Sequence, residues 1–126
     1  MRVVRVEDGR GYRWGQLYAA LVAMRGLAEG GRIVPAPPNE VRAATHNPYN
    51  DSLRLLRDVG HRLFTAREKG GAVAEAAVVV MADVARLVPA RREPRDGLGA
   101  PAAQHFRQGY EARLAAYRES WAELVD

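Results

Sequence analysis

The sequence contains no cysteine, and this absence removes several kinds of site at once. Without thiols the chain can form no disulfide, no thiolate zinc centre and no cysteine nucleophile. Long apolar runs are also missing, because the longest candidate, 72–88, is interrupted by Glu75, Asp83 and Arg86. Residues 1–11 carry charges throughout and lack the apolar core of a signal peptide. We therefore expect a cytoplasmic protein that has no membrane partner.

Recognisable catalytic and metal-binding motifs are missing as well. The chain has no glycine-rich phosphate loop, no nucleophile elbow and no helix with a His-Glu metal motif. The three histidines, His46, His61 and His105, do not stand at the spacing of a metal site. The polar cluster 45–51 is explained by helix capping, with Asn47 as the N-cap residue. We predict that the protein is not an enzyme and uses no cofactor, metal or small-molecule substrate.

What the sequence does contain is helical periodicity. A chain of 126 residues, 48% apolar and 27% charged, has the size and composition of one globular domain. The spacing of apolar residues predicts an all-α fold, a small bundle of about four helices forming a single domain over 1–126. Residues 1–11 are expected to form a short flexible or edge segment that contains the β-prone run Arg2–Val6. The helices are expected at 12–28, 48–69, 72–88 and 100–126.

Each expected helix carries a specific prediction about packing. In 100–126, six residues recur every three or four positions, which places them on one face that we expect in the core rather than stacked on bases. These are Phe106, Tyr110, Leu114, Tyr117, Trp121 and Leu124. Helix 72–88 is apolar nearly all round and is therefore expected at the centre, and Phe64 is expected to face the core. Gly15 is compatible with a close helix crossing or with a merely tolerated glycine. Residues 32–47, with three prolines, are expected to form a long loop with at most one short turn.

The basic residues suggest a partner. The formal net charge is +4, and eighteen of the nineteen basic residues are arginine, whose forked donors match phosphate and carboxylate groups. The functional interpretation is a track for phosphates, and the alternative is a solvated helix surface with cations near C-terminal helix dipoles. The residues predicted to bind nucleic acid are Arg54, Arg57, His61, Arg62, Arg67, Lys69, Arg86, Arg91 and Arg92.

Three segments of the sequence are similar to a known pattern. Residues Tyr12–Leu21 resemble the tyrosine-x-x-glycine-x-leucine-x-alanine-x-leucine helix near the C-terminus of the type I-C CRISPR Cascade large subunit. Residues Asn50–Leu63 resemble the leucine-rich helix of that region. Residues Gln104–Tyr110 keep the glutamine, phenylalanine and glycine-tyrosine of a further element, with one gap shortened by a residue. The proline-rich segment 35–38 and the basic loop 91–95 depart from the family.

The resemblance implies a helical, non-catalytic Cascade small subunit, because such systems also make this C-terminal region as a separate chain. Its partners would be guide RNA, the backbone of displaced single-stranded DNA, other Cascade subunits and copies of itself. Sequence would then be recognised by base pairing, so that the subunit needs only backbone contacts. The rival interpretation is a protein-interaction module, such as an adaptor, a phage-encoded inhibitor or a self-assembling dimer, and mixed charges in 100–126 favour it.

Overall fold

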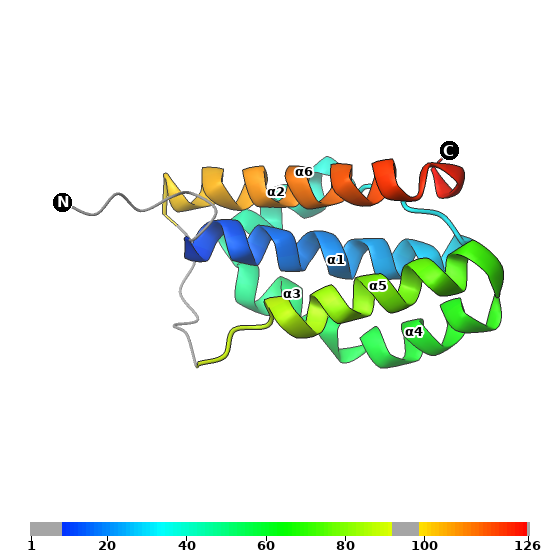
Figure 1. Ribbon diagram of the computed structural model, residues 1–126. Coiled ribbons are helices and arrows are strands. Elements are labelled where there is room, and N and C mark those ends of the chain that lie inside the picture. Colours follow the sequence, from blue (N-terminus) through cyan, green and yellow to red (C-terminus); the bar gives the residue numbers. More distant parts are fainter. Residues whose placement is uncertain (1–8, 92–98, 126) are drawn as a thin grey trace.

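A computed structural model describes residues 9–91 and 99–125, and its regular elements there are all helical. The all-α prediction is confirmed, but the number of helices is larger than the four expected. The α-helices are α1 (Arg10–Gly30), α2 (Pro38–His46), α3 (Pro48–Arg57), α4 (Val59–Glu68), α5 (Gly71–Leu87) and α6 (Ala102–Ser120), followed by a short 3-10 turn, η2 (Ala122–Leu124) (Figure 1).

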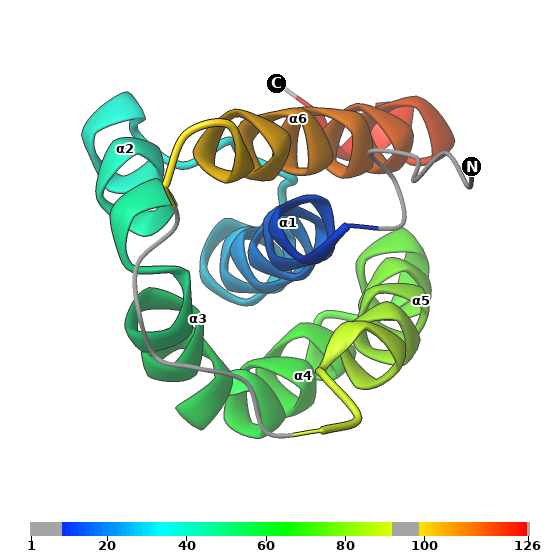
Figure 2. The same ribbon diagram turned by 90° about the vertical axis from the view of Figure 1, so that its left-hand side faces the viewer.

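Helix α1 lies at the centre of the bundle, and α2 to α6 surround it (Figure 2). Most of its residues are buried, including Leu17, Leu21 and Met24. The prediction that 72–88 is the central helix is wrong, because α5 buries only one face and leaves Val78 and Val79 each 46% exposed. Hydropathy favoured α5 as the central helix. The small residues of α1, however, let neighbouring helices approach it from all sides.

The most extensive helix contact in the described part of the chain joins α1 to α6, which run parallel (Figure 1). At Gly15 a Cβ atom would overlap the backbone carbonyl of Phe106, and at Gly109 it would overlap that of Tyr12. The two backbones therefore touch where side chains are absent. Of the two interpretations of Gly15, the close helix crossing is the one observed. Phe106 is fully buried, and Tyr110, Leu114, Tyr117 and Leu124 are buried with it, as predicted. The sixth predicted residue, Trp121, is only half-buried, because α6 ends at Ser120 and not at 126 as expected.

The expected proline-containing loop includes a nine-residue helix, α2, so this prediction is wrong in its second half. Pro38 occupies the first turn of α2, where its fixed φ favours a helix. Residues 33–37 form no regular element, and Ile33 is buried and donates its N–H to the carbonyl of Leu124 at 2.9 Å. The N–H of Ala36 donates to the hydroxyl of Tyr110 at 3.0 Å. The segment is therefore anchored to the C-terminal part of the bundle.

The helix expected over 48–69 is divided at Asp58 into α3 and α4. The N–H of Asp58 bonds to the carbonyl of Leu55 in a tight turn, and its own carbonyl starts α4 by accepting from Arg62. The break lets the chain bend around α1 (Figure 2). Phe64, which was expected in the core, is 66% exposed, so that prediction is wrong.

Helices α5 and α6 are joined mainly through Asp83. The Tyr117 hydroxyl donates to Oδ2 of Asp83 at 2.7 Å, and Arg113 donates to the same oxygen at 3.5 Å. Burial raises the pKa of the Tyr117 hydroxyl, and its hydrogen bond to the Asp83 carboxylate raises it further. These polar contacts hold α5 against α6.

A β-prone run was predicted at residues 2–6 and a nucleic-acid contact at Arg92, and both lie outside the described residues. Within 9–91 and 99–125, no helix has the length and hydropathy needed to cross a bilayer.

We predict that Gly15→Ala destabilises the fold by roughly 1–3 kcal/mol, because the added methyl group must separate α1 from α6. Gly60→Ala in α4 is the matched control, since a Cβ atom added there would meet nothing within 4 Å. That control should gain up to about 1 kcal/mol from helix propensity. Urea unfolding measures both variants, and equal effects would contradict the close-contact interpretation.

The buried tyrosines predict a loss of stability in alkali. Burial raises the pKa of Tyr18 from 10.0 to about 12, and the nearby Glu40 charge adds to the effect. Since the folded pKa is the higher one, the unfolded chain ionises first, so stability is full below pH 10 and falls between pH 10 and 12. Tyr18 alone accounts for a loss on the order of 2 kcal/mol. Urea unfolding across this range checks the loss, and a free energy of unfolding that stays constant from pH 10 to pH 12 would contradict it.

Candidate nucleic-acid interface

The outward side of α3 and α4 carries most of the residues predicted to bind phosphate. Pro48 begins α3 and is buried, which orients the first turn toward the core. Ser52 and Leu55 continue the buried face, so Arg54 and Arg57, which lie on the opposite side of the helix, are exposed. The predicted side-chain cap by Asn47 does not form, although Asn47 does occupy the N-cap position.

Four cationic or titratable side chains on α3, on α4 and just after it are exposed and lack a carboxylate partner within the described residues. They are Arg57, His61, Arg67 and Lys69. Because no acid within that part of the chain neutralises Arg57, Arg67 and Lys69, the charge of these three side chains is available to an anionic partner.

Other predicted residues are held by neighbouring acids. Arg54 lies 3.7 Å from Asp51, although its side chain is 71% exposed. Arg62 lies 3.9 Å from Asp58, and its side chain is only 19% exposed. Such surface pairs contribute little to stability, but they reduce the charge offered to a partner. Arg62 is therefore the weaker candidate of the two.

Of the three remaining predicted residues, the two that the structure describes lie on α5 and directly after it. Arg86 lies on α5 and donates to Oδ1 of Asp83 at 3.3 Å, so it belongs to the contact between α5 and α6. Arg91 follows α5 and lines a pocket that also includes Leu53 of α3. Arg92 lies outside the described residues. The structure therefore does not gather all nine residues into one patch.

Phe64 is the functional candidate that the sequence analysis missed. Its ring is 66% exposed on α4 and, with Gly60, Leu63, Arg67 and Glu68, lines a surface depression. The signal was present in the sequence, because adjacent helical residues point about 100° apart and Leu63 occupies the inward position. An exposed aromatic ring beside available cations is the combination with which proteins hold single-stranded nucleic acid.

We define the α3–α4 basic surface as Arg54, Arg57, His61, Phe64, Arg67 and Lys69. The arrangement can bind a polyanion through charge and stack a ring on Phe64. Among residues 9–91 and 99–125, no group of three or more histidines and acids could hold a metal ion. His46 and His61 are exposed, and His105 is half-buried.

In comparisons with known proteins, no protein-family model, no curated protein and no solved structure matches this chain. The resemblance to the Cascade subunit therefore stays a prediction.

Proposed function

We propose that the α3–α4 basic surface binds the backbone of single-stranded nucleic acid without catalysing a reaction and without reading its sequence. The observation that carries the proposal is the exposed ring of Phe64, which lines a surface depression together with Arg67. Arg57 on α3 and Lys69 just after α4 add two exposed cations, and none of the three cations has an acidic partner in the described part of the chain. Phosphate contacts provide affinity through the release of counterions and carry no sequence information.

The aromatic ring separates this proposal from a merely solvated helix face. A solvated face accounts for arginine and lysine, whose charged ends prefer water. It offers no favourable contact to the side chain of Phe64, which is two-thirds exposed. Stacking a base on Phe64 would cover the ring, and this contact is tolerant of sequence because every base has a π face.

The sequence resemblance suggests the setting in which such a surface works. The proposed assembly is a Cascade-like, RNA-guided complex in which this chain is a small subunit. There the surface would hold guide RNA or displaced DNA, and the subunit would contact other Cascade chains and copies of itself. Backbone contacts suffice because base pairing selects the target.

The second candidate function is a protein-interaction module. It is favoured by the exposed apolar side chains of α5, Val78 and Val79, together with Phe64 on α4. Exposed apolar residues that form a contiguous patch mark sites where proteins associate. In this case Phe64 would pack against a protein and not against a base.

We predict that the triple variant Arg57→Glu, Arg67→Glu and Lys69→Glu binds a labelled single-stranded DNA much more weakly than the parent protein. Removal of three phosphate contacts should lower the salt slope of log affinity by about 2. Fluorescence anisotropy at several salt concentrations measures both quantities.

The matched control reverses three exposed arginines elsewhere, with the same change in net charge. These are Arg42 on α2 and Arg107 and Arg118 on α6. The control should keep most of the affinity. If both triple variants lose binding equally, net charge and not this surface is responsible, and the proposal fails.

For Phe64 we predict that Phe64→Ala weakens binding to single-stranded DNA by about 1–3 kcal/mol and leaves the salt slope unchanged. Phe64→Leu is the discriminating variant, because it keeps an apolar side chain and removes the π face. A base-stacking role predicts that both variants bind weakly. If Phe64→Leu binds DNA normally while Phe64→Ala disrupts self-association in ultracentrifugation, the protein-interaction function is correct.

A further inference from the structure

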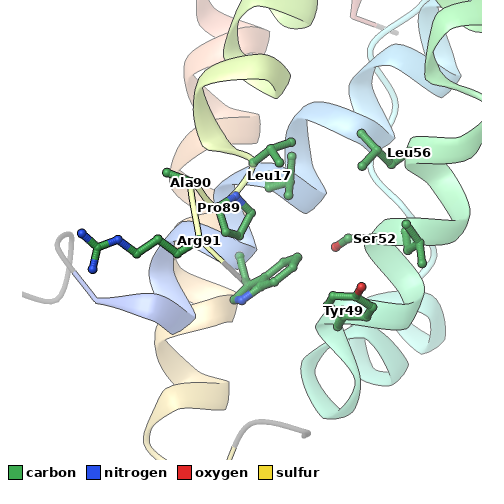
Figure 3. Close-up of a pocket in the computed structure, with 10 residues that line it drawn as sticks. Leu17, Tyr49, Ser52, Leu56, Pro89, Ala90 and Arg91 are labelled. Atoms are coloured by element: carbon green, nitrogen blue, oxygen red, sulfur yellow. The ribbon is translucent and has the colours of Figure 1, made fainter. Parts of the chain in front are cut away.

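A pocket of about 280 Å³ lies between the beginning of α1, the helix α3 and the chain that follows α5. In Figure 3, Tyr49 and Ser52 of α3 face Leu17 and Pro89 across the hollow. None of its lining residues contributes to the α3–α4 basic surface. The pocket is therefore a separate feature, and its role can be tested independently of nucleic-acid binding.

Among the polar side chains that line this pocket, Ser52 is the one whose hydroxyl is buried without a partner in the described part of the chain. Ser52 is 1% exposed, and its Oγ has no hydrogen-bond partner within the described residues. The oxygen points toward the hollow in Figure 3. A buried hydroxyl without a partner costs free energy, and a ligand that bonds to it would recover that cost.

The rest of the lining is mainly apolar and aromatic. The rings of Trp14 and Tyr49 lie 6.1 Å apart between centroids at 62°, an edge-to-face arrangement that forms one corner of the pocket. Leu56 and Val88 supply aliphatic surface. A flat aromatic ligand fits such a corner, because rings gain from both burial and oriented ring contacts.

Size and polarity narrow the class of ligand further. Pockets that hold drug-sized molecules begin near 300 Å³, so a pocket of about 280 Å³ suits a smaller ligand, such as one pair of fused rings. The unpartnered hydroxyl of Ser52 can satisfy one polar atom of a ligand. Although Arg91 belongs to the lining, its guanidinium extends away from the hollow in Figure 3, so no described lining residue places a charge inside it.

We infer that this pocket is a binding site for a small, uncharged bicyclic aromatic molecule that has one polar ring atom, which hydrogen-bonds to Ser52. The ligand would join α1, α3 and the segment after α5, and it would thereby raise the stability of the bundle by mass action.

The test uses three probes of nearly equal shape: indole, benzofuran and indene. Indole carries a ring N–H, benzofuran carries a ring oxygen, and indene has neither. Each is titrated into the full chain while NMR follows the side-chain signals of Trp14 and Tyr49. We expect saturable shifts at both residues, with indole or benzofuran binding roughly fivefold tighter than indene.

Two variants make the result decisive. Ser52→Ala removes a hydroxyl that makes no hydrogen bond within the described residues, so the variant should fold and should bind all three probes with the affinity of indene. Ala90→Trp places a large side chain on an exposed residue of the rim and should abolish binding.

The inference is overturned if no probe produces saturable shifts at Trp14 and Tyr49. It is equally overturned if Ser52→Ala leaves the preference for the polar probes intact, or if Ala90→Trp binds like the parent protein.

Discussion

The structure depends on the contact between the backbones of α1 and α6. Gly15 and Gly109 each present a bare Cα where a side chain would strike the other helix. The close approach buries Phe106 completely and sets the distance at which Tyr18 meets Phe106 and Tyr110, with ring centroids 5.7 Å apart in both pairs. Because the two helices are packed so closely, the aromatic face of α6 has little room to shift against α1.

Once α6 is seated on α1, the other helices have only the remaining faces of α1 to cover. The chain bends at Asp58 to follow that curvature, and Phe64 is left facing outward. Arg25 of α1 binds Glu40 of α2 at 2.9 Å. The Asp83 network joins α5 to α6. The basic surface is therefore a result of how the bundle wraps around its central helix.

Periodicity predicted the all-α class, the stripe of α6 and most helix limits, because it reports which face of a segment is buried. It does not report the neighbour that buries it, and α5 was therefore taken for the central helix. The break at Asp58 was invisible because Leu56, Val59 and Leu63 keep helical spacing across it. For the site, spacing placed Arg54 and Arg57 correctly on an exposed face. The acids that pair with three of the predicted arginines stand three or four residues before them, and this signal could have been read from the sequence.

The parallel pairing of α1 with α6 has a consequence for the order of folding. Residues 10–30 form their largest interface with residues 102–120, at the far end of the described chain. During synthesis the central helix must wait for these partners, with its apolar faces only partly covered by α3, α4 and α5. Contacts between segments so distant in sequence close late, since loop entropy must be overcome first. A ribosome-bound fragment that ends before residue 102 therefore exposes apolar surface of α1, which makes it prone to aggregation until residues 102–120 are made.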